Sequence, residues 1–78
     1  MSYVDEKTLA KAFREWRRKN QYSMRAAAKA ANMTVPAVQR IEQGAIPELR
    51  NLQRVGAVFH MTGGQVFDKY FSDIQKDQ

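Results

Sequence analysis

Apolar residues recur along this chain with the spacing of helices. In residues 5–20, Leu9, Phe13 and Trp16 stand four and three positions apart, so a helix places them on one face. No segment alternates apolar and polar residues over several positions, which is the pattern of a half-buried strand. The pattern therefore predicts an all-α fold.

Local signals divide the chain into five predicted helices. Ser23 and Thr34 are N-cap candidates, because their hydroxyls can accept backbone N–H groups that have no partner inside a helix. Gly44 is typical of the position just after a helix, Pro47 of a helix's first turn, and the glycine pair at 63–64 of a break. The predicted helices span residues 5–20, 24–31, 35–43, 47–60 and 65–76.

The second and third predicted helices form a unit over residues 23–44. Residues 24–31 hold five alanines, which favour a helix and let another backbone approach closely. Asn32 lies in the turn, and asparagine enters the left-handed region more readily than most residues. Two short helices around a tight turn, with the second one exposed, can place that second helix in the DNA major groove. The unit therefore predicts sequence-specific DNA binding.

Positive charge accompanies this unit. The chain of 78 residues has a formal net charge of +5. Residues 1–64 hold eleven lysines and arginines against five acidic residues, whereas residues 65–78 hold two against three. A polyanion such as nucleic acid is attracted to a basic surface of this kind, so the charge supports the same prediction.

The length fits one domain over residues 1–78, with its core in residues 5–64 and a C-terminal helix over residues 65–76. The chain has no cysteine, which excludes disulfides and thiolate metal sites. Its start is polar, and no apolar run approaches the roughly 20 residues needed to span a bilayer. We therefore expect a soluble, cytoplasmic protein with no membrane contact.

Residues 40–44 read Arg-Ile-Glu-Gln-Gly, and apolar and polar residues before and after this string match the spacing of a known family. The further matches are Leu9, Phe13, Trp16, Arg17, Ser23, Ala28, Val38, Pro47, Leu49, Leu52, Val55, Phe59, Met61, Thr62, Val66 and Phe67. The chain thus resembles the phage repressor and Cro-type helix-turn-helix family, also called XRE-like or lambda-repressor-like, from about Leu9 to Phe67. The resemblance implies a compact five-helix bundle with a central helix-turn-helix. It also implies a transcriptional regulator, a repressor from a phage, plasmid or other mobile element, that binds a palindromic operator in double-stranded DNA as a homodimer. A shielded, bidentate ion pair between Arg17 and Glu42 is a further implication of the resemblance.

The third predicted helix carries the candidate base-reading residues, which are Val35, Pro36, Ala37, Gln39 and Arg40. Gln39 can hydrogen-bond adenine, and Arg40 can bind guanine or a phosphate. Val35 and Ala37 lack polar side-chain atoms, but either can contact thymine methyl groups if it lies at the surface. The family usually has polar residues at the start of this helix and a glutamine at the position of Met24. We therefore expect partly apolar readout, assisted by the shape of the DNA.

Candidate phosphate contacts lie at the N-termini of the predicted helices, where backbone N–H groups favour anions, with Lys29 and Arg54 as further candidates on the same helices. They are Ser23, Arg25, Lys29, Thr34, Arg50, Asn51 and Arg54.

The last predicted helix offers a candidate dimer contact. Its apolar side chains exceed what a small core obviously needs, and pairing two copies would bury them. They are Phe67, Tyr70, Phe71 and Ile74. The alternative is that this helix folds over its own core.

The alternative function is a protein-binding regulator, such as an antitoxin or antiactivator, because Met24 and the apolar start of the third helix would suit a protein contact. An enzyme is not expected, since the chain offers no nucleophile with a base and an orienting group. His60 is the only histidine, and it fits the end of the fourth helix better than a metal site. We therefore expect no catalytic residue, metal, cofactor or small-molecule ligand.

Overall fold

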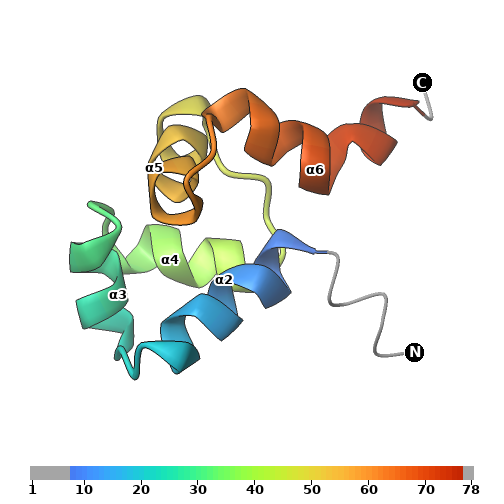
Figure 1. The fold of residues 1–78 in the computed structure, drawn as a ribbon. Coiled ribbons are helices and arrows are strands. Elements are labelled where there is room, and N and C mark those ends of the chain that lie inside the picture. The colour runs from blue at the N-terminus through green and yellow to red at the C-terminus, as the bar shows by residue number, and fades with distance from the viewer. Residues whose placement is uncertain (1–7, 77–78) are drawn as a thin grey trace.

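The computed structural model describes residues 8–76, and in that range the chain forms five helices and no strand (Figure 1). The helices are α2 (Leu9–Lys19), α3 (Met24–Ala30), α4 (Val35–Glu42), α5 (Leu49–Phe59) and α6 (Gly63–Lys76). The predicted all-α fold of five helices is confirmed. None of the helices in the described range is long and apolar enough to cross a lipid bilayer.

The first three helices begin at hydroxyl N-caps. Thr8 precedes α2 and accepts a hydrogen bond from the backbone N–H of Lys11, so α2 begins at Leu9, while the predicted start at residue 5 lies outside the described residues. Ser23 accepts from the N–H of Ala26, and Thr34 accepts from the N–H of Ala37. The predicted caps of α3 and α4 are therefore confirmed. Each accepts a hydrogen bond from a backbone N–H that has no partner inside its helix.

The boundaries around α5 differ from the prediction. Pro47 lies two residues before α5, whose N-cap position is taken by Glu48. His60 ends α5 in the left-handed conformation with φ 61°, which confirms its predicted place at the end of this helix. The predicted break at residues 63–64 is wrong, because these glycines form the first turn of α6. That turn begins at Thr62, whose side chain and backbone exchange hydrogen bonds with Gln65.

The helices form two groups that share one core. α5 packs against α6, and α4 packs against both α2 and α3 (Figure 1). The rings of Phe13 in α2 and Phe59 in α5 meet edge to face at 6.4 Å and so connect the two groups. Trp16 also packs against the core, as expected, with its ring 5.0 Å from that of Phe13. A hollow of about 450 Å³ remains between the start of α2, the end of α4 and α6.

The C-terminal helix contributes to the core instead of standing free. Val66 is fully buried and Phe71 is only 8% exposed, so the core extends past the predicted limit of residue 64. Phe67 and Tyr70 pack partly buried against the same core. The side chain of Ile74 lies outside the described side chains. The predicted dimer contact is therefore wrong for Phe71, and the alternative of a helix folded over its own core describes this residue.

Candidate nucleic-acid interface

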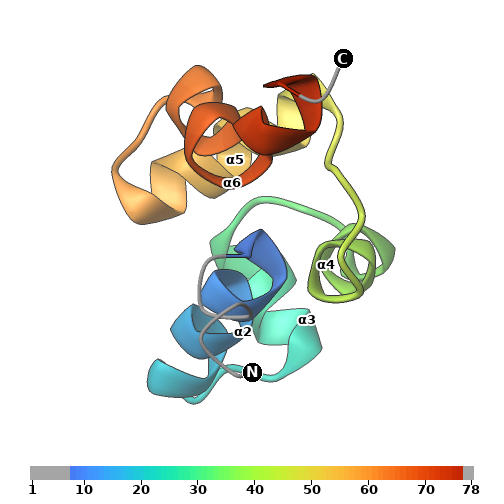
Figure 2. The ribbon, with the colours of Figure 1, turned by 90° about the vertical axis from the view of Figure 1, so that its right-hand side faces the viewer.

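One side of α4 is free of contacts with the rest of the bundle. Figure 2 looks along α4 and places it at the edge of the molecule, with α2 and α3 to one side. Val38 and Ile41 point into the core and are almost completely buried. Pro36, Gln39 and Arg40 occupy the other side and are exposed. The helix therefore presents a polar face that could enter a groove of DNA.

Ala37 does not lie on that face. Only 7% of its surface is exposed, because it shares the inward side of α4 with Val38. Its expected contact with thymine methyl groups is thus wrong, since the methyl group is covered by the protein itself. Val35 is half-buried against the core, and so is Met24 at the start of α3. Core packing therefore explains the apolar character of both positions.

The predicted ion pair between Arg17 and Glu42 is present and joins α2 to the end of α4. The Nε of Arg17 donates to Oε2 of Glu42 at 2.7 Å, and Nη2 donates to Oε1 at 3.1 Å. The side chain of Glu42 is 5% exposed and that of Arg17 is 19% exposed. Hydrogen bonding to the side chain of Glu42 raises the pKa of Arg17 above its ordinary value. Arg17 also donates to the backbone oxygen of Tyr22, so it holds the turn before α3 as well.

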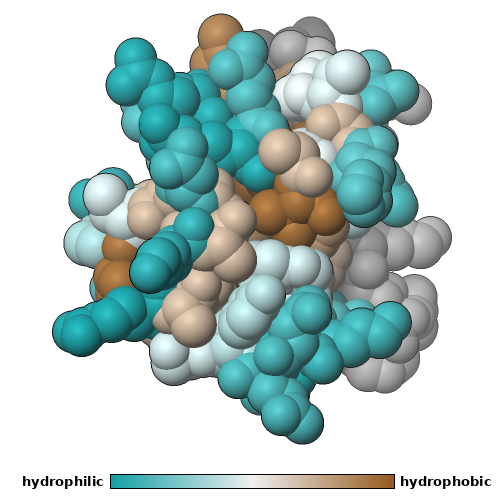
Figure 3. Space-filling view, turned by 60° about the vertical axis from the view of Figure 1, so that its left-hand side comes forward, coloured by the Kyte–Doolittle hydropathy of each residue, from teal (hydrophilic) through white to brown (hydrophobic). Residues whose placement is uncertain are grey.

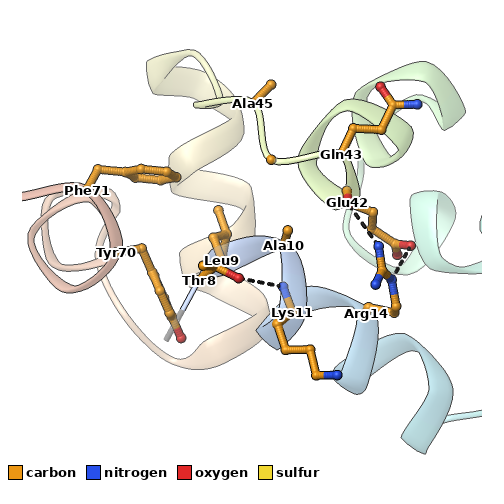
Figure 4. A pocket seen from close by; sticks show the side chains of 11 residues that line it. Thr8, Leu9, Ala10, Lys11, Arg14, Glu42, Gln43, Ala45, Tyr70 and Phe71 are labelled. Carbon is orange, nitrogen blue, oxygen red and sulfur yellow. Dashed lines mark hydrogen bonds and ion pairs between the residues drawn. The ribbon is translucent and has the colours of Figure 1, made fainter. Parts of the chain in front are cut away.

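A second arginine reaches the same carboxylate. Arg14 donates to the backbone oxygen of Glu42 at 2.9 Å, and its Nε lies 3.6 Å from Oε1 of that residue (Figure 4). Sequence reasoning missed this contact. The signal was the spacing, because Arg14 and Arg17 are three positions apart and so share one face of a helix.

Most of the predicted phosphate contacts are exposed around α4. The exposed ones are Ser23, Arg25, Lys29, Thr34 and Arg50. Asn51 and Arg54 are half-buried, and Nη1 of Arg54 donates to Oδ1 of Asn51 at 3.3 Å. These two side chains therefore support each other at the start of α5, with part of their hydrogen-bonding capacity already used.

A shallow groove of about 510 Å³ runs between α3 and α5. Ala30, Ala57 and Val58 contribute apolar surface to it, while Arg50 and Arg54 lie along its edge. Figure 3 shows this side of the molecule, where hydrophilic side chains border a central apolar area. Apolar surface and two arginine side chains of α5 therefore line the same groove.

The surface around α4 carries little negative charge. No acidic residue occurs between Glu15 and Glu42, a stretch that includes all of α3 and the exposed side of α4. Glu42 itself is buried and paired with arginine. The exposed charges of α3 and α4 are therefore all positive, and the nearest exposed carboxylate after them in the chain is Glu48, which lines one hollow together with Arg40.

Comparison with known proteins supports the interpretation of this geometry. A family model described as helix-turn-helix matches residues 13–63. The matched stretch is more than half of the chain and contains all of α3, α4 and α5. No curated protein matches the chain.

Proposed function

Because the chain belongs to the helix-turn-helix family of DNA-binding regulatory domains, we propose that it is a sequence-specific transcriptional repressor that inserts α4 into the major groove. The observation that carries the proposal is the exposed side of α4. Gln39 and Arg40 stand there side by side, in a stretch of the chain from residue 16 to residue 41 that contains no acidic residue. Bound to an operator, such a protein represses by occupying the DNA that polymerase needs.

Base reading is assigned to three side chains of this face. Gln39 can bond both N6 and N7 of adenine, and Arg40 can bond both O6 and N7 of guanine. Pro36 is exposed in the first turn of α4 and offers an apolar contact for a thymine methyl group. Val35 contributes only the part of its side chain that the core leaves uncovered.

The operator is proposed to be palindromic and to bind two copies of the chain. A two-fold pair of reading helices recognises two half-sites about one turn of DNA apart. The resemblance to phage repressors supports this arrangement and a source in a phage, plasmid or other mobile element.

The alternative, a regulator that binds only protein, has less support. It rested on the apolar residues at the start of α3 and α4. Met24 and Val35 pack against the core, so no protein partner is needed to explain them.

We expect Arg40→Ala to weaken binding to the preferred sequence by about 10- to 100-fold and to relax selectivity at one base pair, because one bidentate contact is lost. Gln39→Ala should act in the same way at a neighbouring base pair. The measurement is selection of bound sequences from a random DNA pool, followed by affinity for the selected site at one salt concentration.

Lys69→Ala is the matched control. It removes the same charge from an exposed position on α6 and should leave selectivity unchanged. A wild-type protein that enriches no sequence would contradict the proposal and favour the protein-binding alternative. Unchanged selectivity in both α4 variants would remove the base-reading assignment.

A further inference from the structure

Two large apolar side chains are exposed within the described residues, and they lie three positions apart. Ile46 is 48% exposed and Leu49 is 68% exposed. They occupy the connector after α4 and the first position of α5. We propose that this apolar patch, Ile46 with Leu49, is the contact through which two copies of the chain meet on DNA. The inference rests on the proposed function and moves the dimer contact away from α6.

In the part of α6 whose side chains are described, the apolar residues contact the core of their own chain. Phe71 belongs to the core, and Phe67 and Tyr70 pack against it. Of the side chains that the sequence assigned to a dimer, Phe71 is therefore used within one chain, and Phe67 and Tyr70 are partly used there. Ile46 and Leu49 are not covered by other side chains to a comparable extent. Removing exposed apolar groups of this size from water is favourable, so they favour contact with another surface.

The position of the patch limits what can cover it. Arg40, which is proposed to read a base, lines the same hollow of about 250 Å³ as Ile46 and Asn51. The patch thus borders the surface that faces DNA. Phosphate groups offer nothing to a leucine or isoleucine side chain, so the occupant is a molecule that sits beside this chain on the same duplex.

Charge identifies that molecule as a second copy. Leu49 lies between Glu48 and Arg50, and both neighbours are exposed. In a two-fold contact, every pair of residues from the two copies occurs twice, once on each side of the axis. With Leu49 at the axis, Glu48 of each copy can face Arg50 of the other, which pairs opposite charges on both sides. A uniformly acidic or basic partner would match only one of the two residues.

The size of the patch predicts when the contact forms. Two side chains offer far less than the ~800 Å² per partner of a standard stable interface. The contact is therefore weak between free chains and forms when neighbouring half-sites hold two copies close together. It should appear as cooperative binding to an operator.

The test compares DNA carrying one half-site with DNA carrying two in palindromic order. Wild type should fill the second half-site at least about 10-fold more tightly than an isolated one. The double variant Ile46→Gln, Leu49→Gln should lose this gain and keep the affinity for a single half-site. Both substitutions leave the net charge of the chain unchanged, so its attraction to phosphate is unchanged. Leu49→Met keeps an apolar side chain and should keep cooperativity.

Two further controls test whether the cooperativity comes from a contact between the two copies. Inserting about five base pairs between the half-sites rotates one half-site by about half a helical turn relative to the other. This insertion should abolish the cooperativity of the wild type. At high protein concentration without DNA, NMR shifts that change with concentration should be confined to residues 45–51 and absent from the double variant. Circular dichroism confirms that the variants fold.

Cooperativity that survives in the double variant, or is missing in wild type, would overturn the inference. Loss of affinity for a single half-site in that variant would also overturn it, because Ile46 and Leu49 would then contact DNA. Failure of the proposed function has another signature, since wild type would then bind no half-site at all, and the inference would fall with it.

Discussion

Replacing Arg17 by methionine is expected to lower the free energy of unfolding by about 3–5 kcal/mol, because it leaves the buried carboxylate of Glu42 without its closest partner. Arg14 stays nearby, but its Nε lies 3.6 Å from the carboxylate and only its contact with the backbone oxygen is short. Small domains have only about 5–15 kcal/mol in total. The variant should therefore be marginally folded at room temperature, and urea denaturation followed by circular dichroism measures the loss.

A second substitution tests the cause. In Arg17→Met with Glu42→Met the buried charge is gone, so the double variant should be more stable than Arg17→Met alone. Arg18→Met is the control, since Arg18 is exposed on the same helix and its loss should change stability by less than about 0.5 kcal/mol. If the double variant were as unstable as the single one, the loss would come from packing and not from the stranded carboxylate.

Gly56→Ala should destabilise the protein by about 3 kcal/mol, although alanine has a higher helix propensity than glycine. A Cβ on Gly56 would overlap the carbonyl oxygen of Met61 and lie 3.0 Å from its carbonyl carbon and 3.1 Å from that of Thr62. These are backbone atoms, and they are held in place. Met61 donates its N–H to the oxygen of Gly56 at 2.7 Å, and His60 turns the chain in the left-handed conformation. Thermal or urea unfolding measures the effect.

Gly64→Ala is the matched control. Gly64 lies in the first turn of α6, and the nearest atom to an added Cβ is the hydroxyl of Thr62 at 3.9 Å. This substitution should stabilise the protein by up to about 1 kcal/mol, because glycine loses more backbone freedom on folding. Stabilisation by both substitutions would show that the turn after α5 can move away from Gly56, which contradicts the close approach described above.

The elements were largely predictable because their signals are local. The N-caps Ser23 and Thr34 bond to N–H groups three residues away, and the apolar spacing of α2 spans two turns. The errors occurred where two local signals competed. Pro47 is compatible with a first turn, but α5 begins at Leu49. The glycines at 63–64 are compatible with a break, but Thr62 and Gln65 cap a helix that includes them.

The candidate site was predictable in part. Gln39 and Arg40 are exposed, because a helix that buries Val38 and Ile41 must turn them outward. Ala37 was assigned to the wrong side, since a small side chain carries little hydrophobic signal. The rotation of α4 against α2 and α3 decided its position.

Within residues 8–76, the amino-acid order by itself determined the number and type of helices, the caps of α3 and α4, and the side of α4 that is polar. Backbone hydrogen bonding and apolar periodicity act within a few residues, so they can be read from neighbours in the chain. Which apolar surfaces stay uncovered was decided only in three dimensions. Phe71 became core while Leu49 stayed in contact with water, because burial depends on the helices that happen to lie opposite.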